Sequence, residues 1–224
     1  MTSPAKVSPA KVSAAVVGVF VVALGALLLL TGREAGDPGG SSVATETGLV
    51  RSDSRVLGEP GSTDVVLVEF LDFECEACGA AFPVVEQLRE KYAGQVTFVA
   101  RYFPLPGHFN AERAARSVEA AARQGKFEDM YTLMFATQHQ WGEQQVPIDG
   151  TFRQYAEQIG LDLEQYDADY ADPAVAERVQ RDVADGVELG VQGTPTFFLN
   201  GARFEPRSFD DFDAALAEAL AQQR

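Results

Sequence analysis

Cysteine and histidine are scarce in this sequence, with two of each among 224 residues. Two thiols cannot supply the disulfide framework on which small secreted domains depend. A structural zinc site would need all four of these side chains, and His108 and His139 lack the spacing of zinc-finger ligands. We therefore expect no metal centre, and a fold that depends on the hydrophobic core of a single domain.

Basic residues are also few, because 18 lysines and arginines stand against 33 acidic residues, for a net charge of −15. All of this acidic excess falls after residue 55. A surface this negative repels phosphate backbones and anionic lipid headgroups. We therefore expect no nucleic-acid partner.

Charged residues are absent from Ala14 to Leu30, close to the N-terminus. As a helix, this apolar run spans roughly 26 Å, near the lower limit for a bilayer core. Lysines precede the run and acidic residues follow it, a pattern that predicts a cytoplasmic N-terminus. We expect residues 1–13 to form a cytoplasmic tail and residues 14–31 to form a single-pass transmembrane anchor.

A cleaved signal peptide is the alternative for this run. The run ends without a small-x-small cleavage site and no lipobox cysteine is present, so we favour the uncleaved anchor. Both alternatives place the rest of the chain outside the cytoplasm. Residues 32–56 are rich in glycine, serine, threonine and proline, which predicts a flexible linker before a folded domain at residues 57–224.

The two cysteines form a Cys75-x-x-Cys78 motif where a strand gives way to a helix. Val65–Phe73 is β-branched and aromatic, which predicts a buried strand, and Ala80–Tyr92 carries apolar residues at helical spacing. Free N–H groups and the dipole at the start of a helix favour a thiolate there. A structural disulfide at this spacing would close almost no loop, so we interpret the motif as a redox pair.

The order of the remaining elements predicts the fold. A second strand lies at Gln95–Leu105, and helical patterns then run from about residue 108 to 190. Gly193–Leu199 and Ala202–Phe204 predict a hairpin, and a last helix follows at Phe209–Ala221. We expect an α/β, thioredoxin-like fold with a helical insertion between a β-α-β half and a β-β-α half.

The sequence resembles the DsbA-like thiol:disulfide oxidoreductases, in the membrane-anchored form of Gram-positive bacteria. The resemblance covers residues 60–222 and is carried by four segments in the same order: VEFLDFECEAC, VTFVARYFPLPGH, AARSVEAAARQGKF and GTPTFFLNG. It implies disulfide exchange with secreted or cell-surface proteins, usually in the oxidising direction and without a cofactor. It also implies re-oxidation by a quinone-linked membrane partner of the DsbB or vitamin K epoxide reductase (VKOR) type.

Thiol chemistry and the resemblance together give the expected roles. Cys75, nearer the start of the helix, is expected to be the nucleophile that forms a mixed disulfide, and Cys78 to be the resolving thiol. Thr194 and Pro195 match the family's cis-proline position, where the backbone would pair with an extended substrate strand. The alternative for Pro195 is an ordinary trans proline that starts a strand.

Glu69 is a carboxyl group in an otherwise apolar strand, where it is costly without a partner or a function. The resemblance aligns it with an acidic residue beneath the active site, and we expect it to relay the proton of Cys78 through water. The alternative is a carboxylate that faces solvent, and Asp72 is a second candidate for the relay. We expect His108 to lie in a loop away from the thiols, with no catalytic role.

One departure from the family concerns the two residues between the cysteines. Many relatives carry proline and histidine there, whereas this sequence has Glu76 and Ala77. Like-charge repulsion from the glutamate would raise the pKa of Cys75 and weaken the disulfide as an oxidant. We favour an oxidase, with a membrane-tethered reductase or isomerase as the alternative, and a non-catalytic thioredoxin-fold binding module as a rival from another class. No long heptad pattern argues for a dimer, so we expect a monomer.

Overall fold

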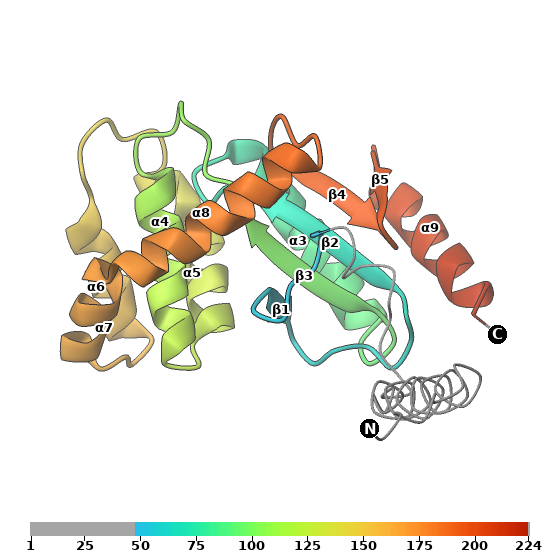
Figure 1. The fold of residues 1–224 in the computed structure, drawn as a ribbon, viewed down its shortest axis with the longest axis horizontal. Helices are drawn as coiled ribbons and strands as arrows, with labels where there is room; N and C mark the ends of the chain where they lie inside the picture. Colours follow the sequence, from blue (N-terminus) through green and yellow to red (C-terminus); the bar gives the residue numbers. More distant parts are fainter. Residues whose placement is uncertain (1–47, 224) are drawn as a thin grey trace, which may run out of the picture. The chain divides into compact units, whose positions relative to one another are not determined.

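A five-stranded mixed sheet forms the centre of the folded domain (Figure 1). The computed structural model describes residues 48–223, so the predicted tail, the transmembrane anchor or signal peptide, and most of the linker lie outside the described residues. Within residues 48–223, no helix has the length and apolar character needed to cross a bilayer.

The strand order is β1-β3-β2-β4-β5. β2 and β3 are parallel, and the other neighbours are antiparallel. β2 is flanked by strands on both sides and buried on both faces, which explains why its sequence is a nearly continuous apolar run. The strands are β1 (Arg55–Leu57), β2 (Val66–Leu71), β3 (Thr97–Tyr102), β4 (Thr196–Leu199) and β5 (Ala202–Phe204).

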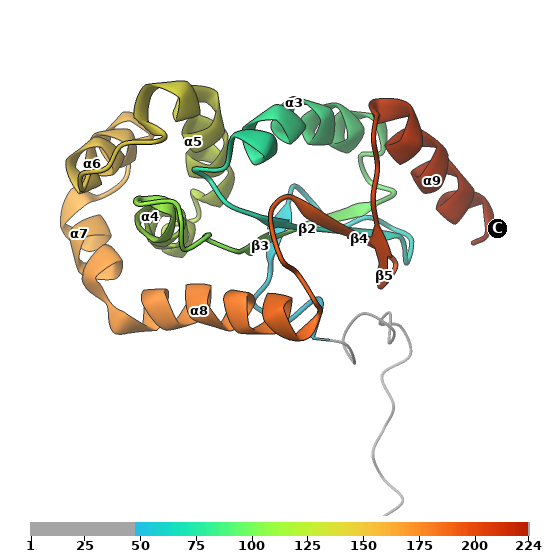
Figure 2. The ribbon, with the colours of Figure 1, turned by 90° about the horizontal axis from the view of Figure 1, so that it is seen from above.

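Helices cover both faces of the sheet and extend beyond one end of it (Figure 2). α3 and α9 lie on one face, α8 lies on the other, and α4 to α7 gather at the end where β2 leads into α3. This arrangement confirms the predicted α/β, thioredoxin-like fold with a helical insertion. The helices are α3 (Glu76–Lys91), α4 (Ala111–Arg123), α5 (Phe127–Trp141), α6 (Asp149–Gln158), α7 (Leu163–Ala171), α8 (Pro173–Glu188) and α9 (Phe209–Ala221).

The two faces of the sheet bury separate apolar clusters. Because side chains alternate along a strand, Leu67 and Leu71 of β2 join the larger cluster with α3, whereas Val68 and Phe70 join the smaller one. The larger cluster continues into the insertion through aromatic rings such as that of Phe73, whose centroid lies 5.0 Å from that of Phe135 on α5. Pairs of this kind contribute about 0.5–1.5 kcal/mol each beyond the area they bury.

The end of the predicted linker is corrected by the structure. Residues 48–56 are packed on the domain rather than extended as a tether: Leu49 is 1% exposed, and β1 pairs with β3. Arg55 of β1 donates from Nε to a carboxylate oxygen of Glu119 on α4 at 2.9 Å. The composition of this segment is that of a linker, but a few apolar and charged side chains within it have specific partners.

A buried group of charges joins the insertion to the sheet. The Arg101 side chain on β3 is fully buried, and it donates to Asp182 at 2.7 Å and to Asp185 at 2.5 Å, both on α8. It also donates to the carbonyl oxygen of Gly48 at 3.0 Å. β3, α8 and the segment before β1 are therefore held together through one guanidinium group.

Candidate active site

Cys75 lies at the N-cap of α3, directly after the loop that leaves β2. The helix begins at Glu76, about one turn earlier than its sequence pattern predicts, so its unpaired N–H groups surround the first cysteine itself. Both cysteines are free thiols, with Cys75 6% exposed and Cys78 fully buried. The site therefore has one thiol near the surface and one beneath it.

Hydrogen bonds lower the pKa of Cys75 to about 5. The largest contribution is the hydrogen bond with the Cys78 thiol, and burial opposes it; Thr194 and the backbone N–H groups of Ala77 and Cys78 add to the lowering. As a thiol, Cys75 donates to the carbonyl oxygen of Thr194 at 3.4 Å. Cys75 is thus set up as a thiolate nucleophile at neutral pH.

Cys78 has the opposite environment. Burial, the hydrogen bond with Cys75 and the charge of Glu69 raise its pKa well above the ordinary value. The N–H of Asp72 lies 3.5 Å from its sulfur. Cys75 is therefore a stabilised thiolate and Cys78 a protonated thiol. Disulfide exchange uses a thiolate as the attacking and leaving group, which is the form that Cys75 takes.

The loop before β4 lies against the thiol of Cys75. The Thr194–Pro195 peptide bond is cis, and β4 brings the loop to the start of α3 because it pairs with β2. A small groove begins at Pro195 and continues along Thr196 and Phe197 to the return strand at Arg203. Thr194 and Pro195 are half-buried, so their backbone borders both the thiol and the groove.

Glu69 lies in the protein interior beneath the two thiols. It is 5% exposed, so its carboxyl group does not face solvent. Burial, followed by the charges of Glu86 and Cys75, raises the pKa of Glu69 to about 8. The carboxyl is therefore mostly protonated at neutral pH and can donate or accept one proton. Asp72, the second candidate, is also buried, but backbone N–H groups and His108 already occupy its oxygens.

Gln138 is a residue of the site that carries no sequence signal. From α5 it reaches the loop before α3, where its Nε2 donates to the carbonyl oxygens of Phe73 at 2.7 Å and of Cys75 at 2.8 Å. A Cβ at Gly79 would lie 2.1 Å from the Oε1 of Gln138, so only glycine allows this approach. The insertion thereby holds the backbone that carries the nucleophile.

The prediction that His108 lies away from the thiols is wrong. Its Nδ1 lies 2.6 Å from Oδ2 of Asp72, and its charge interacts with that of Cys75. The prediction failed because the loop after β3 folds back over the end of β2, a long-range contact that the sequence pattern does not encode.

The expected effect of Glu76 on the thiol is not observed. Glu76 and Ala77 are both exposed, and the pKa of Cys75 is lowered rather than raised. A carboxylate oxygen of Glu76, a ring nitrogen of His108 and a carboxylate oxygen of Glu143 lie within 4.8 Å of one another. The ion pair of His108 is with Asp72, so we interpret Glu76 and Glu143 as two further carboxylates near the imidazole at the edge of the site.

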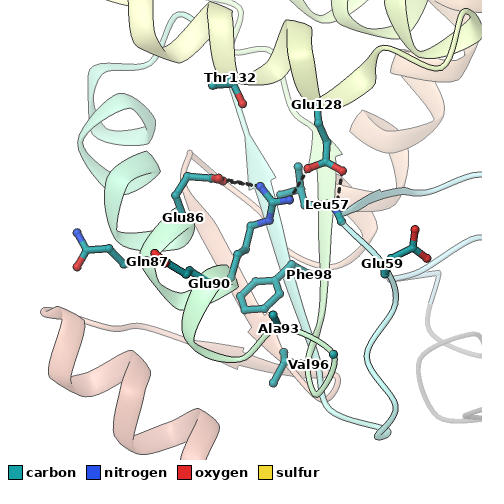
Figure 3. A pocket seen from close by; sticks show the side chains of 13 residues that line it. Leu57, Glu59, Glu86, Gln87, Glu90, Ala93, Val96, Phe98, Glu128 and Thr132 are labelled. Carbon is teal, nitrogen blue, oxygen red and sulfur yellow. Dashed lines mark hydrogen bonds and ion pairs between the residues drawn. The ribbon is translucent and has the colours of Figure 1, made fainter.

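A larger pocket lies at the other end of α3, away from the thiols (Figure 3). Leu57 and Phe98 form part of its lining, together with Arg89, which pairs with Glu86 at 2.7 Å and with Glu128. No cysteine lines this pocket, so thiol chemistry belongs to the N-terminal end of α3.

A thiolate at a helix N-terminus, a buried second thiol and a cis-proline loop on a thioredoxin-like sheet define a protein of thiol-disulfide exchange. The chain belongs to the Thioredoxin_4 family, whose model, described as thioredoxin, matches residues 51–218. It is a thioredoxin-fold protein with the DsbA-like architecture that the resemblance in its sequence implies.

Solved structures similar to this chain share its fold over most of their length. A thioredoxin-like oxidoreductase from Silicibacter pomeroyi DSS-3 is 26% identical, with a TM-score of 0.65 over 78% of this chain and 95% of that one. The alpha-DsbA1 protein of Wolbachia pipientis is 17% identical, with a TM-score of 0.70 over 78% of this chain and 94% of that one.

A relative found by sequence is named as an antiporter rather than as an oxidoreductase. A protein named Na(+)/H(+) antiporter NhaA 3 from Salinispora tropica is 40% identical over 168 residues, which cover 74% of this chain but 24% of that protein. The chain thus spans about a quarter of the length of this relative.

Proposed function

We propose that this protein is an extracytoplasmic thiol oxidase that introduces disulfide bonds into secreted or cell-surface proteins. The observation that carries the proposal is the stabilised thiolate of Cys75, whose pKa is lowered to about 5. Stabilising the reduced form of a cysteine pair makes its disulfide the stronger oxidant. The Cys75 sulfur, which lies near the surface, and the adjoining groove at Pro195 would receive an extended substrate strand.

The chemistry proceeds in two exchanges. A substrate thiolate attacks Cys75 of the Cys75–Cys78 disulfide, and Cys78 leaves as a thiolate and takes a proton, which we assign to Glu69. A second substrate thiolate then attacks the substrate sulfur of the mixed disulfide, and Cys75 leaves with the electron pair. The two electrons remain on the cysteine pair until a quinone-linked membrane partner, of the DsbB or VKOR type, removes them.

The proposed setting is the outer face of the cell membrane, with the chain as a monomer anchored through residues 14–31 and its N-terminus in the cytoplasm. The apolar run and its flanking charges support this setting. A similar segment within a protein named as an antiporter fits a domain that works beside a membrane. After reduction of the Cys75–Cys78 disulfide, labelling of Cys75 on intact cells by a membrane-impermeant thiol reagent would support the location, and labelling only after lysis would contradict it.

The reduction potential of the Cys75–Cys78 pair, equilibrated against glutathione buffers, tests the direction of the reaction. An oxidase predicts a value well above that of thioredoxin, about −270 mV, toward that of DsbA, about −120 mV. A value near that of thioredoxin would favour the second candidate, a membrane-tethered reductase or isomerase.

A further inference from the structure

Asp72 links His108 to the loop that carries the thiols. The Asp72 side chain is fully buried at the end of β2, and its oxygens accept backbone N–H groups from two loops at 2.8 and 2.9 Å. Its Oδ2 also lies 2.6 Å from Nδ1 of His108. The backbone of Asp72 accepts the N–H of Cys75 at 3.2 Å and directs its own N–H to Cys78 at 3.5 Å. A residue that orients both thiols therefore also orients the imidazole.

The charges that face His108 come from three parts of the chain, and all are negative. They are the carboxylates of the loop after β2, the start of α3 and the segment after α5, together with the thiolate: Asp72, Glu74, Glu76, Glu143 and Cys75. Burial lowers the pKa of His108, but its hydrogen bond with Asp72 and the charges of Asp72, Cys75 and Glu74 outweigh burial and raise the pKa above the ordinary value of 6.5. An imidazolium is the form that this environment favours.

We propose that His108, held in place by Asp72, supplies the positive charge that stabilises the Cys75 thiolate. The residues between the cysteines cannot supply this charge, because Glu76 is acidic and Ala77 is neutral. The imidazolium would act when Cys75 leaves the mixed disulfide with the electron pair, and it would lower the energy of the reduced pair. This inference rests on the proposed role of Cys75 as the nucleophile.

The same charge explains why Glu76 does not raise the pKa of the thiol. Its carboxylate lies with that of Glu143 beside the imidazole, within the 4.8 Å cluster. A positive charge this close to the carboxylate offsets part of its repulsion of the thiolate. His108 thus has two effects on Cys75: direct attraction of the thiolate, and a partial offset of the repulsion by Glu76.

The test compares His108→Gln and His108→Lys in the full-length chain. The glutamine keeps an N–H donor for Asp72 but removes the charge, whereas the lysine keeps the charge. For H108Q we expect a raised pKa of Cys75, followed through the ultraviolet absorbance of the thiolate, and about a tenfold shift of the glutathione equilibrium toward the protein disulfide. For this two-electron couple, that shift corresponds to a potential about 30 mV more reducing. H108K should lie closer to the unmodified protein.

The matched control is His139→Gln, the same substitution at the chain's other histidine, which is exposed on α5. It should leave both the pKa and the equilibrium unchanged. The proposal is overturned if H108Q matches the control, or if H108K and H108Q shift the pKa of Cys75 equally, since charge would then have no role. Either result leaves the oxidoreductase function standing. That function would fail separately, if the unmodified protein showed no exchange dependent on Cys75.

Discussion

The thioredoxin-like core and the helical insertion contribute different things to the same site. The core supplies the reacting sulfur atoms on α3 and the proline loop before β4. The insertion and the loop that enters it supply two polar side chains. Gln138 holds the backbone of the nucleophile through two carbonyls, and His108, bonded to Asp72, places a positive charge near it. The core thus supplies the reacting groups, and parts of the chain far from the motif adjust the stability of the Cys75 thiolate.

The largest effect is expected from removing a core sulfur atom. Cys75→Ala should abolish exchange with a dithiol peptide, because no other thiol is accessible to form the mixed disulfide. Cys78→Ala cannot form the Cys75–Cys78 disulfide, so it should not oxidise the peptide; its Cys75 thiolate should still attack the disulfide of an oxidised peptide, and the mixed disulfide should persist because no Cys78 thiol is present to release Cys75. Mass spectrometry of the trapped species checks both variants. Retained turnover in Cys75→Ala would favour the binding-module alternative.

The second effect concerns the buried carboxyl of the core and depends on pH. Glu69 has a pKa of about 8 in the folded protein, above its ordinary value of 4.5, so its ionisation destabilises the fold as the pH rises from 4.5 through 8. A shift of this size corresponds to several kcal/mol. Cys75 acts in the opposite direction, because its lowered pKa stabilises the reduced fold increasingly from about pH 5 to 9.

Glu69→Gln separates these two contributions. The reduced variant should unfold at a higher temperature than the unmodified protein, by a margin that is small at pH 4.5 and grows up to pH 8. Thermal unfolding of both reduced proteins across this pH range gives the comparison. A margin that does not change with pH would contradict the buried, protonated state of Glu69.

The third largest effect, on the stability of the fold, is expected at the junction between the core and the insertion. Arg101→Met removes the guanidinium that joins β3 to Asp182 and Asp185, and we expect a loss of roughly 3 kcal/mol, at the low end for a broken buried pair. The loss is moderated because each aspartate retains another arginine partner. Arg153→Met, which removes an exposed ion pair with Asp167, is the matched control and should leave the unfolding temperature unchanged. Equal effects of the two substitutions would contradict a structural role for the buried group.

The sequence predicted the core more completely than the insertion. The core was predicted from local patterns: an apolar strand, a cysteine pair at a helix start, and a hairpin with Asn200 and Gly201 at its turn, where both residues have positive φ. The insertion was predicted as a helical block, but not the contacts it makes with the core. The position of β1 was missed because three residues carry no periodicity.

Two side chains show why the remaining contacts could not be predicted. Gln138 is one of several glutamines near the end of α5, and only the tertiary packing brings it to the carbonyls of Phe73 and Cys75. His108 follows a proline-glycine turn, which indicates a loop but does not show which part of the fold the loop contacts. Local patterns determine elements, whereas the polar contacts of His108 and Gln138 join residues that are 36 to 65 positions apart in the chain.

Substitution of Gln138 should have the smallest effect of the series, and it tests the contribution of the insertion most directly. Gln138→Leu removes the side-chain donor from the carbonyl of Phe73 and one of two donors from that of Cys75, which keeps the N–H of Gly79, a change of about 1–2 kcal/mol for the loop that carries Cys75. If that loop is held in its reactive position by α5, the exchange rate with a dithiol peptide should fall by about tenfold, with little change in unfolding temperature. Gln140→Leu, on the exposed side of the same helix, is the control. A rate equal to that of the control would mean that the core alone positions its nucleophile, and that the insertion affects the thiol only through charge.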